Sequence, residues 1–195
     1  MIKTICTNKK NTIDDKIWNC IKEFIKSYLS KYDSVVDLGC GNGKNIKYLL
    51  ENGFVDVGGC DIDNILVNDC AQNNISIIKA NILSLPYKKD NFDCVLCNGV
   101  IHHIETDENR KKAIKEIFRI CRPGGKIFIS VNSFESKHYS KITNVQDIVI
   151  RYKNKDVFLH LYTEQELTDI FLSLDCKILK ITHECSCLRI VTEKN

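Results

Sequence analysis

Three glycines at alternate positions follow a short apolar run and could bring the backbone close to a bound ligand. In the stretch VVDLGCGNGKN, Asp37 ends the apolar run, and Gly39, Gly41 and Gly43 come directly after it. Glycine permits tight turns and close approach of the backbone to a ligand. The spacing differs from the dinucleotide fingerprint, and an acid directly before the glycines suits a cationic ligand better than a pyrophosphate.

Polar side chains also end the next two apolar runs. Asp61, in GGCDIDN, lies about 20 residues beyond the glycines, where a carboxylate can accept hydrogen bonds from both hydroxyls of a ribose. Asn81, in KANILSLP, could hydrogen-bond an adenine edge, with Ile82 packing on the ring. Because the carboxyl ends of parallel strands meet at one edge of an open sheet, these groups predict a single ligand site there.

Two adjacent histidines follow the fourth apolar run, in NGVIHHIETDENR. Adjacent residues in extended chain point apart, and no cysteine or carboxylate group completes a coordination set, so we expect no metal site. An imidazole could instead act as a base for a phenol or an enol, because it titrates near neutral pH. We favour the interpretation that His102 packs in the protein and His103 lines the pocket.

The composition indicates a soluble intracellular protein. The chain has 11 cysteines among 195 residues, but its first residues mix charges and offer no export signal, so reduced thiols are expected. Cys94 and Cys97 are three apart in a predicted strand and should point to opposite faces. No apolar run approaches the length of a membrane span, and the net charge of +3 permits a polyanionic partner without indicating one.

Apolar runs of strand length alternate with amphipathic stretches of helix length, which predicts a parallel sheet covered on both faces. The expected strands are residues 34–39, 55–61, 75–81, 92–98, 126–131, 176–184 and 187–193. The expected helices are residues 17–29, 44–51, 65–72, 108–121 and 163–174, with a turn at 122–125. We expect one domain, 1–195, with a helical lead-in, 1–33, and an irregular segment, 132–161, on the substrate side.

The stretches DLGCGNG, CDID, ANILSLP, NFDCVLCNGVIHHI and CRPGGKIFIS together resemble the class I S-adenosylmethionine-dependent methyltransferases. The resemblance implies a Rossmann-like α/β sheet of seven strands in the order 3-2-1-4-5-7-6, with the last strand antiparallel and helices on both faces. It implies S-adenosylmethionine as the cofactor, with the methionine part near the glycines, the ribose at Asp61 and the adenine at Asn81. The expected cofactor-binding residues are Asp37, Gly39, Gly41, Gly43, Asp61, Ile62, Asn81, Ile82 and Asn98.

A narrower resemblance concerns the substrate. The segment NGVIHHIETDENR and the later FLHLYTEQEL resemble the eukaryotic tRNA wobble-uridine carboxymethyl methyltransferases, which esterify the carboxylate of 5-carboxymethyluridine. It implies His103 as the catalytic residue and tRNA as the partner, through its anticodon loop. The expected substrate-binding residues are His102, Arg110, His160 and Tyr162. The alternatives are that Arg110 is a solvated charge, and that residues 160–162 only lead into a helix capped by Thr163.

A carboxylate with a pKa of about 4 is ionised at neutral pH, so its methylation needs no general base. Neutral donors, such as a histidine N–H or Tyr162, should serve better than an arginine, because charge is neutralised in the transition state.

The resemblance also implies a small zinc-binding activator subunit. It would dock on the strand 75–81, an apolar sheet edge that invites pairing, so we expect a heterodimer in the cytoplasm, with the nucleus as a second location. Two other functions stay open: a quinone- or sterol-type small-molecule methyltransferase, and a cofactor-binding subunit that does not catalyse.

Overall fold

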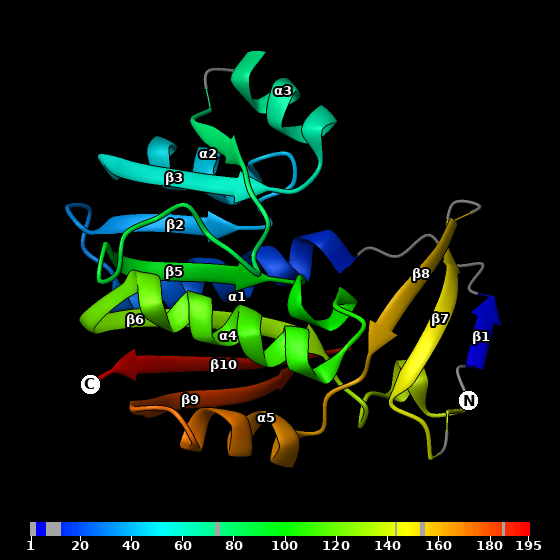
Figure 1. Cartoon of the computed structure of the whole chain (residues 1–195). Helices are drawn as coiled ribbons and strands as arrows, with labels where there is room; N and C mark the ends of the chain where they lie inside the picture. Colours follow the sequence, from blue (N-terminus) through cyan, green and yellow to red (C-terminus); the bar gives the residue numbers. More distant parts are fainter. Residues whose placement is uncertain (1–2, 7–12, 73–74, 143, 153–154, 185) are drawn as a thin grey trace.

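A seven-stranded sheet forms the centre of the computed structural model, which describes residues 3–6, 13–72, 75–142, 144–152, 155–184 and 186–195 (Figure 1). Its strands are β2 Ser34–Leu38, β3 Asp56–Asp61, β4 Ile77–Lys79, β5 Phe92–Asn98, β6 Cys121–Asn132, β9 Cys176–Glu184 and β10 Cys187–Lys194. The order β4-β3-β2-β5-β6-β10-β9 confirms the predicted topology. As predicted, β10 runs antiparallel to both of its neighbours.

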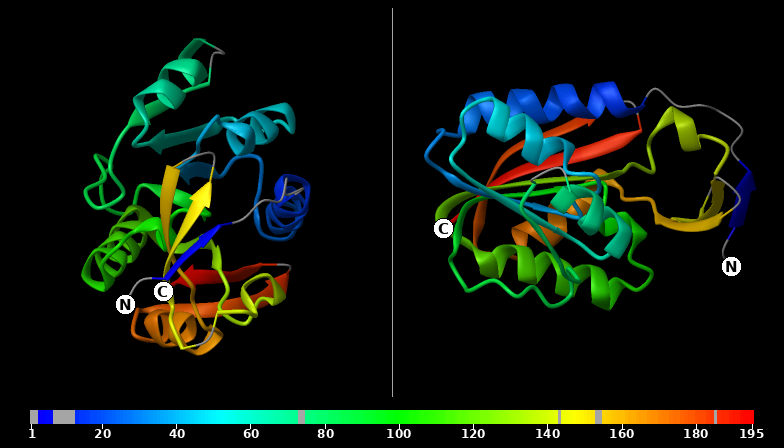
Figure 2. Two further views of the ribbon diagram at one scale, coloured as in Figure 1. Left: turned by 90° about the vertical axis from the view of Figure 1, so that its right-hand side faces the viewer. Right: turned by 90° about the horizontal axis from the view of Figure 1, so that it is seen from above.

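Helices cover both faces of this sheet, because its central strands are apolar on both sides (Figure 2). The helices are α1 Ile13–Tyr28, α2 Lys44–Glu51, α3 Asn64–Gln72, α4 Asp107–Ile120 and α5 Glu164–Leu172. Phe24 of α1 and Leu49 of α2 pack on one face together with Cys94. Ile117 of α4 packs on the other face together with Cys97, which confirms that the two cysteines point apart.

The turn predicted at residues 122–125 is wrong, because these residues continue β6. Phe92 pairs with Cys121 and Cys94 with Lys126, so the register between β5 and β6 shifts there. The extra residues form a bulge, and Gly124 accommodates it with a φ of 77°. The chain therefore kinks within a strand instead of turning between two elements.

The segment 132–161 is not irregular, which corrects a second prediction. It contains a 3₁₀ turn, η2 Lys137–Tyr139, and two antiparallel strands, β7 Asp147–Tyr152 and β8 Lys155–His160. The lead-in is not only helical either, because β1 Lys3–Cys6 pairs in parallel with β7. The resulting three-stranded sheet lies on the side to which the arrowheads of β2, β3 and β5 point (Figure 1).

One face of the small sheet has an apolar core of its own. Ile148 of β7 and Leu159 of β8 form a cluster with Tyr139, Ile142 and Leu161. This packing fixes the small sheet against the chain that leaves β6. Among the described helices, none combines the length and the apolar composition needed to cross a membrane.

Candidate cofactor and substrate site

The glycine loop after β2 is tied to the end of β3. The backbone N–H groups of Gly39 and Cys40 donate to the carbonyl of Cys60, at 2.8 and 3.0 Å. The N–H of Gly41 donates to Asp61 Oδ2 at 2.8 Å, so the first two predicted ligand positions lie together. The loop glycines have positive φ angles of 66°, 56° and 72°, which favour glycine. A Cβ atom on Gly41 would meet nothing within 4 Å, so this part of the loop faces open space.

Asp37 is a buried carboxylate that fits a cationic ligand. The residue is 1% exposed, and Asn45 Nδ2 donates to Asp37 Oδ2 at 3.0 Å. Burial raises the pKa of Asp37 to about 7, with the Asn45 hydrogen bond opposing the shift and the nearby Asp61 adding to it. No cation of the described residues lies within ion-pair distance of this carboxylate. A positively charged ligand would stabilise its ionised form.

Asp61 is fixed in place and keeps capacity for further hydrogen bonds. Its Oδ1 accepts from the backbone N–H of Asp63 at 2.9 Å, while its Oδ2 accepts from the backbone N–H of Gly41. Each carboxylate oxygen has a second lone pair, so two hydroxyl donors can still bind. The next residue, Ile62, leaves 64% of its surface exposed, and it offers an apolar surface to a planar ring. These features fit the ribose and adenine parts expected from the sequence.

Two other expected cofactor residues already make local contacts. Asn81 Oδ1 accepts from the backbone N–H of Leu83 at 2.9 Å and so stabilises the turn after β4. Asn98 Oδ1, at the end of β5, accepts from Ser130 Oγ at 2.5 Å. Ile82 is partly buried against the main core. Their roles in cofactor binding stay predictions.

His102 lies in the wall of the site. It is 5% exposed, and its Nδ1 accepts from the backbone N–H of Asn132 at 3.2 Å. Burial lowers the pKa of His102 well below its ordinary value, and the neighbouring His103 and His160 add to the effect. The ring is therefore neutral and packed, as expected for one histidine of the pair, and it is not offered to a substrate.

His103 is exposed and joins the main domain to the small sheet. Its Nδ1 lies 3.1 Å from the carbonyl oxygen of Phe158, and a carbonyl only accepts, so Nδ1 carries the proton. Loss of solvent around the ring lowers the pKa of His103, although the hydrogen bond to Phe158 opposes the shift. In the neutral ring Nε2 is then an acceptor. The structure thus corrects the predicted donor role of His103.

Arg110 is neither a solvated charge nor available to a phosphate. It is 5% exposed, and its NH1 donates to the carbonyls of Ile104 and Glu105 at 3.0 and 3.2 Å. The guanidinium therefore fixes the chain between the histidine pair and α4. Both sequence-based interpretations of Arg110 are wrong, because its burial depends on carbonyls that only the folded turn brings together.

His160 and Tyr162 also belong to the interior. His160 is 4% exposed and lies between Asp147 Oδ1, 2.6 Å from Nδ1, and Glu166 Oε1, 2.8 Å from Nε2. Tyr162 is fully buried in the main core, and burial raises the pKa of its hydroxyl. Thr163 Oγ1 accepts from the N–H of Glu166 at 3.1 Å, which confirms the predicted helix cap. These residues hold β8 against α5, so their predicted contact with substrate is not supported.

One close contact had no signal in the sequence. Val100 packs against Gly39, where a Cβ atom would come within 2.4 Å of Val100 Cγ2. The glycine loop and the histidine segment therefore touch directly. Among the described residues, no group of three or more potential ligands could hold a metal ion.

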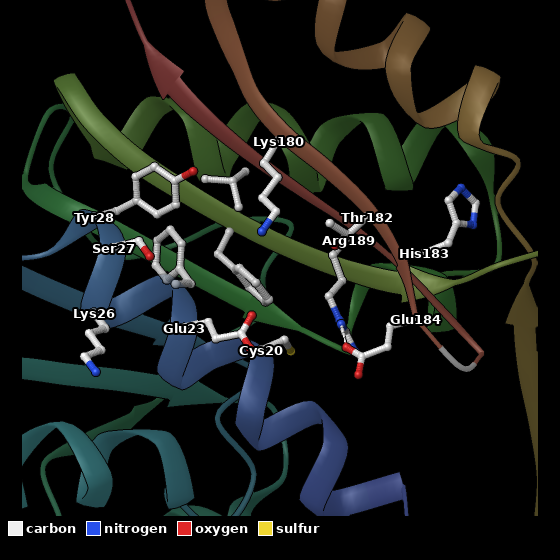
Figure 3. A pocket seen from close by; sticks show the side chains of 13 residues that line it. Cys20, Glu23, Lys26, Ser27, Tyr28, Lys180, Thr182, His183, Glu184 and Arg189 are labelled. Carbon is white, nitrogen blue, oxygen red and sulfur yellow. Dashed lines mark hydrogen bonds and ion pairs between the residues drawn. The ribbon is translucent and has the colours of Figure 1, made fainter.

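A hollow of about 470 Å³ lies on the face of the sheet that α1 covers (Figure 3). Phe24, Phe128 and Val191 line it together with Lys180 and Arg189. The strand β10, which carries Arg189, is separated from β2 by β5 and β6. None of the expected cofactor residues lines this hollow, so it is distinct from the site at the strand ends.

Comparison with known proteins identifies a domain family for the central part of the chain. The family described as "Methyltransferase domain" matches residues 36–129, from β2 into β6. The chain is 33% identical over 135 residues to the tRNA (carboxymethyluridine(34)-5-O)-methyltransferase of Arabidopsis thaliana. The aligned residues make up 69% of this chain and 32% of that protein. The chain is 37% identical over 121 residues to the Xenopus tropicalis protein of that name, covering 62% of this chain and 19% of the other. The chain thus spans a third or less of the length of these relatives.

Solved structures share the fold. An S-adenosylmethionine-dependent methyltransferase of Methanosarcina mazei superposes with a TM-score of 0.77 at 21% identity, covering 88% of this chain and 96% of that one. A methyltransferase of Haloferax volcanii, solved in complex with the Trm112 methyltransferase activator, gives a TM-score of 0.72 at 16% identity, with 93% and 90% covered. At these identities the likeness concerns the fold alone.

Proposed function

We propose that the chain, whose fold and domain match are those of class I S-adenosylmethionine-dependent methyltransferases, methylates the carboxylate of 5-carboxymethyluridine at the wobble position of tRNA. The observation that carries the proposal is its identity of 33% and 37% to two enzymes named for that reaction. The family match over residues 36–129 includes the glycine loop and the histidine segment, which the structure brings into contact.

The residues at the strand ends fit S-adenosylmethionine. Asp37 and the glycine loop would hold the cationic methionine part, Asp61 the ribose, and Ile62 the adenine. When bound, the cofactor supplies a methyl group on a positively charged sulfur. The unpaired carboxylate of Asp37 and the open space over Gly41 are the features of the chain that suit this ligand.

Under this proposal the protein positions the reactants and performs no proton transfer. The substrate carboxylate is ionised at neutral pH, and alignment within about 3 to 3.5 Å together with exclusion of water supplies the rate. Val100 against Gly39 sets the spacing between the cofactor loop and the histidine segment. The hydrogen bond from His103 Nδ1 to the Phe158 carbonyl fixes the histidine segment to β8. Holding Arg110 in the interior also avoids a cation that would stabilise the ground state.

The activator subunit is part of the proposal. Strand β4 lies at the edge of the sheet, and Ile78 within it leaves 42% of its surface exposed. An edge strand with an exposed apolar side chain can pair with a strand of a partner. The Haloferax neighbour, solved with a methyltransferase activator, supports the search for such a subunit.

A second candidate is methylation of a small phenol or enol, which the free Nε2 of His103 favours because a neutral imidazole can accept a proton. The two functions differ in the effect of pH on the rate at saturating substrate. There, carboxylate methylation should not require His103 to be unprotonated, whereas methylation of a phenol should slow as His103 becomes protonated. A rate that follows one ionisation in the wild type and is pH-independent in His103→Gln would favour the phenol.

The direct test is methyl transfer to defined RNA. The protein, with and without a co-purified activator, is incubated with labelled S-adenosylmethionine and tRNA that carries either 5-carboxymethyluridine or plain uridine at the wobble position. We expect ester formation on the first RNA alone, identified by mass spectrometry of the nucleosides. Binding of S-adenosylmethionine in a calorimeter without transfer to any RNA, even with the activator, would reject the proposal and leave the small-molecule methyltransferase and the non-catalytic subunit.

A further inference from the structure

We infer that Phe158 and His103 together hold the uracil base of the RNA substrate, Phe158 by stacking and His103 by accepting the base N3–H at Nε2. The inference rests on the proposed function for its substrate class. It assigns a binding role to the small sheet, which lies outside the family match over residues 36–129.

The register of the β7–β8 hairpin separates its side chains into two faces. Ile148 lies opposite Leu159, and these residues share the face that packs on Tyr139. Val149 lies opposite Phe158, and this pair must occupy the other face, because side chains alternate along a strand. The hairpin thus carries apolar residues on both sides.

Among the described side chains, no hydrophobic cluster accounts for the face of Val149 and Phe158. Both residues are only partly buried, and neither belongs to the hydrophobic clusters formed by the described residues or to the side chains packed against them. The carbonyl of Phe158 is the acceptor for His103 Nδ1, so Phe158 lies directly beside the histidine pair. An aromatic ring that is partly exposed beside a site is a typical platform for a base of single-stranded RNA.

The hydrogen-bonding state of His103 matches uracil. Because Nδ1 donates to Phe158 and the ring is neutral, Nε2 can only accept. Uracil offers a single ring N–H donor, at N3, while its two carbonyls accept. A cytosine has no proton at N3, so the same pair of residues would discriminate against it. The hydrogen bond from His103 Nδ1 to the Phe158 carbonyl therefore leaves His103 with the acceptor that the N3–H of uracil needs.

The first test measures RNA binding without turnover. A fluorescein-labelled anticodon stem-loop with 5-carboxymethyluridine is titrated with wild type, Phe158→Ala and Tyr152→Ala, and anisotropy is recorded. Tyr152 is the matched control, since it is a 53% exposed aromatic residue of the same hairpin whose register puts it on the face of Ile150. We expect Phe158→Ala to weaken binding by about 5- to 100-fold, the range for loss of one base stack, and Tyr152→Ala by less than about 2-fold.

The second test removes the donor from the RNA. The same stem-loop with a methyl group on N3 of the modified uridine should bind wild type about 3- to 10-fold more weakly, as expected for one lost hydrogen bond. His103→Ala should bind the two RNAs equally. Because each protein is compared with itself, a general loss of folding in the variant cannot imitate this result.

Each outcome decides the matter. Equal binding by wild type and Phe158→Ala overturns the inference, and so does an N3-methyl effect that persists in His103→Ala. A wild type that does not bind the stem-loop overturns it as well. Binding that depends on both residues but leads to no methyl ester supports the inference and rejects the proposed function instead.

Discussion

Gly39→Ala should destabilise the protein much more than the same change at Gly41. Both glycines have positive φ angles, 66° and 56°, so an added Cβ costs about 1–2 kcal/mol at either position. At Gly39 that Cβ would also lie 2.4 Å from Val100 Cγ2, whereas at Gly41 nothing lies within 4 Å. Forcing an extra carbon into a packed contact costs a further 1–3 kcal/mol or so.

The free energy of unfolding should therefore fall by about 2–5 kcal/mol in Gly39→Ala and by about 1–2 kcal/mol in Gly41→Ala. Urea unfolding followed by circular dichroism measures both. Adding Val100→Ala removes the two methyl groups that overlap. The double variant should recover most of the difference, with a coupling energy of at least about 1 kcal/mol between positions 39 and 100.

Equal losses for the two glycine variants would refute this reasoning, because they would show that Val100 does not press on the loop. A double variant whose losses simply add would do the same. The contact matters for function, since it joins the cofactor loop to the histidine segment. Val100→Ala alone should lower turnover in the methyl-transfer assay more than it lowers the affinity for S-adenosylmethionine in calorimetry.

Three other predictions concern charge, burial and the sheet edge. Burial raises the pKa of Asp37 to about 7, so the folded protein holds a proton that the unfolded chain has released above pH 4 or so. In urea unfolding, the wild type should lose stability relative to Asp37→Asn as the pH rises from about 4 to 7. In calorimetry, the affinity of the wild type for S-adenosylmethionine should rise as the pH increases through 7, and the affinity of Asp37→Asn should not. Arg110→Met leaves two loop carbonyls without a donor and should lower the free energy of unfolding by about 1–3 kcal/mol, with RNA affinity of the folded protein unchanged in anisotropy titrations. Ile78→Lys should abolish co-purification of the activator subunit while urea unfolding stays within about 0.5 kcal/mol of wild type; retained co-purification would exclude the β4 edge.

The arrangement of the glycine loop and Asp61 could be predicted because its signals are local. The apolar run before Asp37 and the alternate glycines determine a strand and a turn, and the parallel sheet then brings Asp61 to the same edge. The two faces of Cys94 and Cys97 followed from strand geometry alone.

The substrate half could not be predicted, because its burial depends on distant contacts. Arg110 has the sequence context of an exposed helix residue, yet the turn at Ile104 supplies acceptors that remove it from solvent. The strands β7 and β8 were missed because Val149 and Phe158 interrupt the alternation of apolar and polar residues. One of them, Phe158, is also a residue for which we infer a role in binding the base.

The pairing of β1 with β7 has a consequence for how the protein assembles. Lys3 pairs with Ile148, so the small sheet closes only when segments far apart in the sequence meet. Such nonlocal contacts form slowly and tend to open independently of the rest. Hydrogen exchange should therefore protect the amides of β2 and β5 far longer than those of β7. The small sheet would then behave as a late-folding unit, while the cofactor loop stays folded.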